Sequence, residues 1–177
     1  MNLSIIIPVF NSSKILKKLV KNIKYHLDIK LNNKFEIIFI NDHSSDNSWS
    51  VIRELSKKNS FIKGIDLKKN IGQHAAIFVG LNYATASKII TMDDDLQHPP
   101  SYLLKIYNKL SNFDVCYTTY INRQHVLWKI LVSKLNNFFS NFLFNKPNNV
   151  YLSSFRGFKS TIKNRIIKEK PNIIFLD

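Results

Sequence analysis

The amino-acid sequence predicts an α/β fold with a mostly parallel sheet flanked by helices. Short, near-continuous apolar runs rich in isoleucine alternate with longer segments whose apolar residues recur at helical spacing. Continuous apolar runs are typical of strands that are buried on both faces. Three of the runs end in polar clusters, at Phe10–Ser12, Asp42–Asp46 and Asp93–Gln97. Because the carboxyl ends of parallel strands meet at one edge of a sheet, these clusters predict a ligand site there.

The first half of the chain predicts two strand–helix units. Leu3–Val9 is a central strand, and Ser12 or Ser13 is placed to cap the helix that follows it. Phe35–Ile40 is a second strand, and another helix begins near Ser48. The apolar positions of the first helix are spaced along one face, with lysines between them: Leu16, Leu19, Val20, Ile23 and Leu27.

The second half continues the alternation. Phe61–Leu67 is a weaker strand, and a helix rich in small residues spans Ala75–Ala84, which allows close contact with a sheet. A strand begins at Ile89, a helix covers about Pro100 to Leu110, and Asp114–Thr119 is a further strand. Each strand is followed by a helix, which favours right-handed parallel units.

Composition narrows the class of protein. The 177 residues suit one domain, and 45% apolar content with 12% aromatic residues excludes wholesale disorder. Cys116 is the single cysteine, so the chain has no disulfide framework and fits a reducing compartment. We find no signal peptide and no apolar stretch long enough to span a membrane. The expected location is therefore cytoplasmic.

The formal net charge of +14 favours anionic partners such as phosphates or a membrane surface. We expect no nucleic-acid partner, because the basic residues are not interleaved with aromatic residues as RNA-binding platforms require. The acidic run Asp93–Asp95 would also repel phosphates unless it held a metal ion.

This acidic run carries the candidate chemistry. In an extended strand, Asp93, Asp95 and Gln97 would share one side while Asp94 points to the other. Oxygen ligands at this spacing suit a hard divalent cation, Mg²⁺ or Mn²⁺. The chain has no glycine-rich phosphate loop, so a bound diphosphate would need such a cation. The alternative is an acidic turn that caps the next helix, with prolines at positions 99 and 100 in its first turn.

Four segments carry motifs in a characteristic order: IIPVFN from Ile6, INDHSSD from Ile40, NIGQHAA from Asn70 and MDDDLQHPP from Met92. In order and spacing they resemble family 2 glycosyltransferases with the GT-A fold, and within that family the branch that uses polyprenyl-phosphate acceptors. The resemblance covers Leu3 to about Phe158. It implies a GT-A-type fold that binds a nucleotide-diphospho-sugar linked to UDP or GDP.

The resemblance also implies roles for individual residues. It assigns metal binding to Asp93, Asp95 and Gln97. Arg123 and Arg156 are candidates for contact with the diphosphate or with the acceptor phosphate, and they complete the catalytic set with Asp93 and Asp95. The expected contacts to the nucleoside are Pro8, Phe10, Ile40, Asp42 and Asp94.

Some positions depart from the family pattern. Phe10-Asn11-Ser12 stands where Tyr-Asn-Glu is usual, which leaves the choice of nucleotide open. Tyr120 occupies a place often held by arginine, and Ser154 replaces an acidic residue common in the lipid-linked branch. The chain ends at Asp177, before the last part of the family's catalytic domain, so residues 1–177 are expected to form one GT-A domain that is incomplete at its C-terminus.

The function implied is metal-assisted, inverting transfer of a sugar to a polyprenyl phosphate at the cytoplasmic face of a membrane. Two alternatives stay open: a transferase that acts on a saccharide or glycoconjugate hydroxyl, and a non-catalytic remnant that binds nucleotide. Residues 126–145 form an amphipathic helical pattern that suits either a bilayer interface or packing against the sheet.

Overall fold

The computed structural model describes residues 1–32, 34–118 and 153–169. The chain divides into two compact units, one made of Met1–Cys116 with Ser154–Asp177 and the other of Tyr117–Ser153. Arg123 and the expected helix at 126–145 lie outside the described residues. A single domain over residues 1–177 therefore stays a prediction.

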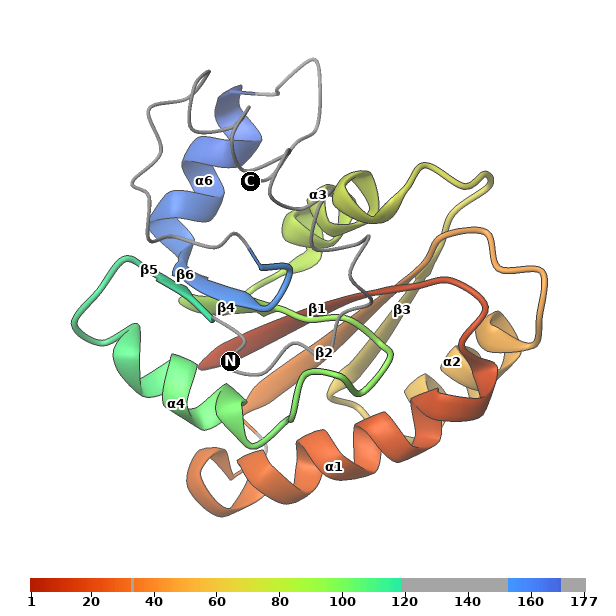
Figure 1. Ribbon diagram of the computed structural model, residues 1–177, viewed down its shortest axis with the longest axis horizontal. Coiled ribbons are helices and arrows are strands. Elements are labelled where there is room, and N and C mark those ends of the chain that lie inside the picture. The colour runs from red at the N-terminus through yellow and green to blue at the C-terminus, as the bar shows by residue number, and fades with distance from the viewer. Residues whose placement is uncertain (33, 119–152, 170–177) are drawn as a thin grey trace, which may run out of the picture. The chain divides into compact units, whose positions relative to one another are not determined.

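The described residues contain a six-stranded sheet in the order β3-β2-β1-β4-β6-β5 (Figure 1). β1 to β4 are parallel to one another, and β6 runs antiparallel to β4. This arrangement confirms the predicted α/β fold with a mostly parallel sheet. The strands are β1 (Leu3–Val9), β2 (Phe35–Asn41), β3 (Ile62–Asp66), β4 (Lys88–Thr91), β5 (Val115–Tyr117) and β6 (Arg156–Lys159). The helices are α1 (Ser13–Leu31), α2 (Ser48–Lys58), α3 (Gln73–Tyr83), α4 (Tyr102–Lys109) and α6 (Ser160–Glu169).

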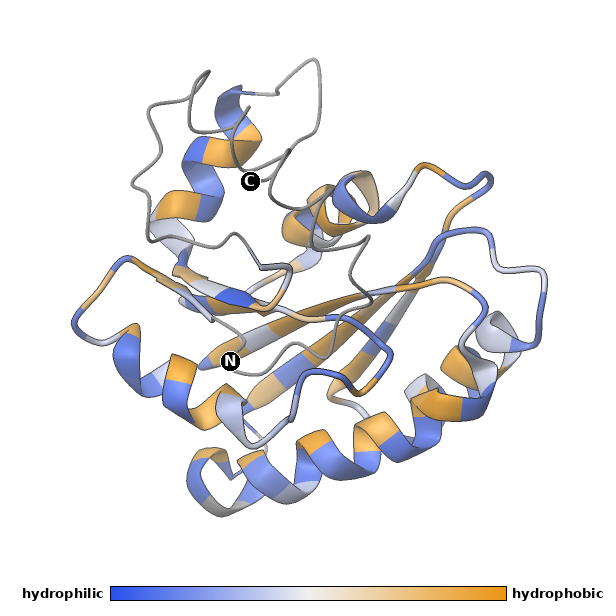
Figure 2. Cartoon of the chain, viewed as in Figure 1, coloured by the Kyte–Doolittle hydropathy of each residue, from blue (hydrophilic) through white to orange (hydrophobic). Residues whose placement is uncertain are grey.

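Helices cover both faces of the sheet, with α1, α2 and α4 on one side and α3 and α6 on the other (Figure 1). Because successive side chains of a strand point to opposite faces of the sheet, each strand contributes to the apolar cluster on both faces. In β1, Ile5 and Ile7 belong to the cluster with α1, whereas Ile6 belongs to the cluster with α3. The apolar stripe of α1 faces the sheet and its lysines face outward (Figure 2).

Helix α3 approaches the sheet closely because its contact residues are small. Ala76 is fully buried, and a Cβ atom added to Gly80 would lie 2.5 Å from Cγ2 of Ile6. This contact confirms the prediction that small residues let the helix pack tightly on the strands. Any larger side chain at position 80 would have to displace Ile6 or the helix.

The sequence reasoning did not find β6. This strand pairs with β4, Gly157 lying opposite Ile90, and it separates β4 from β5. A side chain at Gly157 would collide with Ile106 of α4. The signal is weak because the four residues Arg156–Lys159 contain two basic side chains and a glycine, and their pairing depends on β4, which is far away in the sequence.

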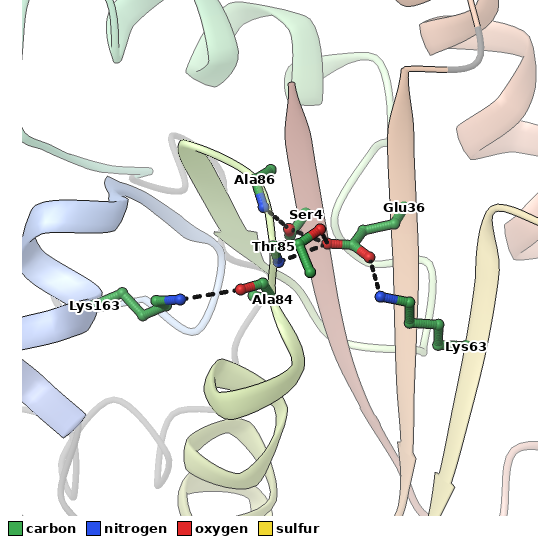
Figure 3. Close-up of polar contacts among 7 residues, drawn as sticks. All are labelled: Ser4, Glu36, Lys63, Ala84, Thr85, Ala86 and Lys163. Atoms are coloured by element: carbon green, nitrogen blue, oxygen red, sulfur yellow. Dashed lines mark hydrogen bonds and ion pairs between the residues drawn. The ribbon is translucent and has the colours of Figure 1, made fainter. Parts of the chain in front are cut away.

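A buried carboxylate joins the amino ends of β1 and β2 to the turn before β4 (Figure 3). Oε1 of Glu36 accepts hydrogen bonds from Oγ of Ser4 (2.6 Å) and from N and Oγ1 of Thr85 (2.8 Å each), and Oε2 lies 2.7 Å from Nζ of Lys63. Burial alone would raise the pKa of Glu36, but the bonds from Lys63, Ser4 and Thr85 outweigh it and lower that pKa. The network fixes where β4 begins.

Candidate functional site

A cleft of about 430 Å³ lies at the carboxyl ends of β1, β2 and β4. As predicted, the polar clusters that follow these three strands meet at one edge of the sheet. Three further residues come from the loop that leads into α3 and from the first residue of that helix. The cleft is lined by Pro8, Val9, Phe10, Asp42, Asn70, Gly72, Gln73, Asp93, Asp94 and Asp95.

The loops after β1 and β2 are hydrogen-bonded to each other. Oδ1 of Asn11 accepts from the backbone N–H of Ser45 (2.8 Å), and Asn11 has a φ of 55°. Oδ2 of Asp46 accepts from the N–H of Ser13 (3.0 Å), at the start of α1. Ser12 is the N-cap residue of α1, as predicted, but its hydroxyl donates to the carbonyl of Phe10 and makes no capping bond. These bonds fix the wall of the cleft.

Of the residues expected to contact a nucleoside, Pro8 and Phe10 line the cleft. The Phe10 side chain is 53% exposed, an unusual state for a phenylalanine that follows a buried strand. Ile40 differs from expectation. Its side chain is fully buried in the cluster beneath α3 and does not line the cleft, because alternation along β2 directs it into that core.

Asp42 lines the cleft and also binds the backbone of the loop that leads into α3. The residue is 3% exposed, and its two carboxylate oxygens accept the backbone N–H groups of Ile71 (2.8 Å) and Gly72 (2.9 Å). Nδ2 of Asn70 donates in return to the Asp42 carbonyl (3.1 Å). Gly72 has a φ of +86°, a conformation that glycine adopts without strain. Asp42 therefore shapes the loop that starts α3, a role that the sequence did not indicate.

The three carboxylates of the acidic run all line the cleft. The predicted alternation, with Asp94 on the opposite side from Asp93 and Asp95, assumed an extended strand that the structure does not have here. β4 ends at Thr91, so the acidic run is a bend rather than extended strand, and Leu96 takes a φ of 61°. The same bend leaves the Gln97 side chain exposed and absent from the lining, so the structure does not bring it together with the carboxylates.

Asp93 has the most contacts of the three. Nε2 of Gln73 donates to Oδ1 of Asp93, and Oγ of Ser154 donates to its Oδ2 at 2.6 Å. Nδ1 of His98 lies 3.6 Å from Oδ2. Sequence reasoning missed Gln73 and Ser154 as site residues, although both lie within segments that carry the family resemblance.

Asp94 and Asp95 differ in environment. Oδ2 of Asp94 is buried and accepts no hydrogen bond. Burial raises the pKa of Asp94, and the charge of Asp95 adds to this, while the nearby Ser12 hydroxyl and Phe10 backbone oppose it. Asp95 is exposed, and its Oδ1 accepts from the N–H of Gln97 (3.0 Å).

The acidic run does not cap the next helix. α4 begins at Tyr102 with no acidic residue in its first turn, and its N-cap Ser101 makes no side-chain hydrogen bond. The N–H of Tyr102 is satisfied instead by the carbonyl of Pro99 (3.0 Å). The carboxylates are therefore directed to the cleft, not to helix capping.

The donor set fits a hard divalent cation that is shared with a ligand. Three carboxylates border one cleft, and one buried Asp94 oxygen lacks a hydrogen-bond donor. Within the described ranges, no group of three or more His, Cys, Asp or Glu side chains is arranged to hold a metal ion alone. Mg²⁺ and similar ions are commonly bound by one or two carboxylates together with substrate phosphates. A cation here would need oxygens from a bound diphosphate.

Of the two arginines expected to contact phosphate, the structure describes one, Arg156. Arg156 is 3% exposed, lies opposite Thr91 in the pairing of β6 with β4, and is not part of the lining. Arg123 lies outside the described residues.

Among the helices that the structure describes, none combines the length and the apolar character needed to cross a membrane.

Solved structures share this fold at low sequence identity. A mannosyltransferase, PcManGT from Pyrobaculum calidifontis in complex with GDP-Man and Mn²⁺, matches with a TM-score of 0.67 and 16% identity, covering 93% of this chain and 46% of its own. Glucosyl-3-phosphoglycerate synthase from Mycobacterium tuberculosis, in complex with Mn²⁺, UDP-glucose and phosphoglyceric acid, matches with a TM-score of 0.69 and 14% identity. The match covers 91% of this chain and 57% of the synthase chain. S. aureus TarS, residues 1–349, matches with a TM-score of 0.63 and 18% identity, covering 93% and 49%.

These matches establish the GT-A-type fold, and this chain spans about half the length of the proteins concerned. A family model described as glycosyl transferase family 2 matches residues 4–166, which is nearly the whole chain and includes every residue that lines the cleft. The chain belongs to glycosyl transferase family 2.

Proposed function

We propose that this chain is the nucleotide-sugar-binding part of an inverting glycosyltransferase that transfers a sugar from a UDP- or GDP-linked donor to a polyprenyl phosphate. One observation carries the proposal. Three carboxylates at the end of β4 and an exposed aromatic ring at the end of β1 border the same cleft, which lies where α/β folds bind nucleotides.

Each end of the cleft suits a different part of the donor. The Phe10 ring offers a face on which a nucleobase can stack, and Pro8 extends that apolar surface. The amino end of α3 borders the cleft through Gly72 and Gln73, and the partial positive charge at a helix amino end favours phosphate. The acidic run completes the diphosphate end through Asp93 and Asp95.

A divalent cation would be held by Asp93 and Asp95, and when bound it supplies Lewis-acid stabilisation of the charge on the leaving diphosphate. Asp42 contributes indirectly, because it fixes the loop at Asn70–Gly72 against which the donor lies. Solved structures with this fold contain Mn²⁺ together with nucleotide sugars, which supports the same class of ligand here. Arg123 and Arg156 stay sequence-based candidates for phosphate contact.

The type of acceptor depends on whether the cleft offers a general base. Asp42 and Asp93 each accept hydrogen bonds from the protein at both oxygens, and Asp95 is assigned to the cation, which leaves Asp94, with one unbonded oxygen, as the candidate base for a hydroxyl acceptor. A polyprenyl phosphate is already anionic, whereas a sugar hydroxyl must lose a proton during attack. This acceptor would place the chain at the cytoplasmic face of a membrane, and the net charge of +14 suits an anionic surface.

Calorimetric titration of UDP, GDP and their sugar conjugates tests the donor half of the proposal. We expect one nucleotide to bind in the presence of Mn²⁺ and to lose most of its affinity in EDTA, in Asp93→Ala and in Asp95→Ala. Asp114→Asn, an exposed carboxylate paired with Lys159 away from the cleft, should bind as the wild type does. Unchanged binding in both cleft variants would defeat the assignment of the metal ligands.

The acceptor is tested by transfer of labelled sugar to polyprenyl phosphate in detergent, compared with water-soluble saccharides. Preferential labelling of the lipid supports the proposal, and labelling of saccharide hydroxyls alone would favour the other type of transferase. Membrane association is tested by liposome co-sedimentation of the wild type and of a Leu131→Asp, Phe139→Asp double variant. Equal sedimentation of the two would argue that residues 126–145 pack against protein.

A further inference from the structure

Each carboxylate oxygen of Asp93 accepts a hydrogen bond from an uncharged side chain. Gln73, the first residue of α3, donates from Nε2 to Oδ1, and Ser154, which directly precedes Phe155 and β6, donates from Oγ to Oδ2. The three residues come from segments that are far apart in the sequence. The side chain of Asp93 is 24% exposed, so it reaches the cleft while its position is fixed from behind.

We propose that Gln73 and Ser154 are positioning residues that hold the Asp93 carboxylate in one orientation for cation binding. The inference rests on the proposed function, in which Asp93 is a metal ligand. It assigns roles to two residues on the basis of their contacts with Asp93, and neither residue needs to touch the metal or the nucleotide.

Both donors are anchored independently of Asp93. The carbonyl of Ser154 accepts a hydrogen bond from Oγ1 of Thr91, the last residue of β4. The backbone just before Gln73 is fixed by the bond from the N–H of Gly72 to Asp42. The backbone at each donor is therefore held by bonds that do not involve Asp93, as preorganisation of a metal ligand requires.

The chemistry of the two donors also suits this role. An ionised carboxylate has about four lone-pair sites. Oδ2 of Asp93 faces both Ser154 and, at 3.6 Å, Nδ1 of His98, whereas Oδ1 accepts one hydrogen bond and keeps a site for a cation. Because an amide and a hydroxyl are uncharged, they orient Asp93 without cancelling the negative charge that attracts a cation. A lysine or arginine in either place would orient the carboxylate but also neutralise it.

The test is direct measurement of Mn²⁺ affinity in the full chain, from the electron paramagnetic resonance signal of free Mn²⁺ at a fixed concentration of UDP or GDP. We expect Gln73→Leu and Ser154→Ala each to weaken Mn²⁺ binding by about 10- to 100-fold, the usual effect of losing a group that orients a ligand. Ser154→Thr keeps the hydroxyl and should restore most of the affinity. Asn82→Ala removes an amide at the far end of the same helix and should have no effect.

Urea midpoints of all variants, measured in parallel, separate positioning from folding. Gln73 is exposed, so Gln73→Leu should keep the wild-type midpoint and still bind Mn²⁺ weakly. Mn²⁺ affinity within twofold of the wild type in both Gln73→Leu and Ser154→Ala, while Asp93→Ala abolishes binding, would overturn this inference and leave the proposed function intact. Unchanged Mn²⁺ binding in Asp93→Ala would overturn both.

Discussion

The substitution Asp42→Asn should destabilise the chain through the loop that starts α3. Both oxygens of Asp42 accept backbone N–H groups, from Ile71 at 2.8 Å and from Gly72 at 2.9 Å. Asparagine keeps one acceptor oxygen and places an NH₂ group against the other N–H. Because Asp42 is 3% exposed, water is poorly placed to repair the mismatch.

The expected cost follows from these contacts. A hydrogen bond to a charged acceptor contributes about 1.5–3 kcal/mol, and an unsatisfied buried donor costs about 1–3 kcal/mol. Losing one bond of the two, and weakening the other by removing the charge, should lower the free energy of unfolding by about 2–3 kcal/mol. For a chain of this size that corresponds to a fall in melting temperature of about 4–12 °C.

Urea denaturation followed by circular dichroism measures the free energy, and amide hydrogen exchange locates the change. Exchange at Ile71 and Gly72 should accelerate more than exchange in β1 or β2. The matched control is Asp66→Asn, because Asp66 is exposed and accepts one hydrogen bond, from Nδ2 of Asn41. Its cost should stay below about 1 kcal/mol. A loss below about 0.5 kcal/mol in Asp42→Asn, with unchanged exchange in the loop, would refute the reasoning.

Three further substitutions test the packing and electrostatics of the fold. Glu36→Ala removes a carboxylate that is 1% exposed and should cost about 3 kcal/mol in urea unfolding, and Lys63→Met, which leaves Oε2 of that buried carboxylate without its partner, should cost about 1–3 kcal/mol; a loss below about 0.5 kcal/mol in both variants would contradict the network. Gly80→Val should cost about 1–3 kcal/mol, since its Cβ would lie 2.5 Å from Cγ2 of Ile6, and an unchanged urea midpoint would argue against the close contact. Burial tends to raise the pKa of Asp46, but bonds from the serines around it lower that pKa from 3.8 to about 2. A lowered pKa in the folded state adds stability above pH 3.8 that is lost as the pH falls to about 2, so acid titration of Asp46→Ala should give a flatter stability profile over this range, and a profile identical to the wild type would be inconsistent with it.

The layers of the fold were accessible from sequence because they depend on local periodicity. β1 occupies the predicted residues, and α1 presents the predicted apolar stripe to the sheet. β6 was not accessible, since its pairing with β4 depends on contacts across more than sixty residues rather than on a local pattern. Its central residue, Gly157, has no side chain to add to an apolar period, yet the close packing of α4 requires that absence.

The location of the site was predictable, and its internal geometry was not. Carboxyl ends of parallel strands must share an edge, so the clusters after β1, β2 and β4 had to lie together. The prediction did not anticipate that the chain bends where extended geometry was assumed, which leaves Gln97 out of the cleft lining. Leu96 adopts a left-handed φ of 61°, which a leucine rarely does and a propensity argument does not anticipate.

The contacts that organise the acidic run are also long-range. Gln73 and Ser154 lie 20 and 61 residues from Asp93, and neither stands out in the sequence as a partner for a carboxylate. Asp42 was assigned to the nucleoside by resemblance, whereas its oxygens bond to the backbone of a loop 29 and 30 residues away. Side-chain roles of this kind depend on the folded arrangement of segments, so residue type and spacing alone do not specify them.

Crystals grown with Mn²⁺ and UDP or GDP, with anomalous diffraction recorded for manganese, test the central claim most directly. The account predicts one manganese peak within ligand distance of Asp93 and Asp95 that also touches diphosphate oxygens in the cleft. A manganese peak elsewhere, or nucleotide bound in this cleft with both carboxylates turned away from it, would contradict the account.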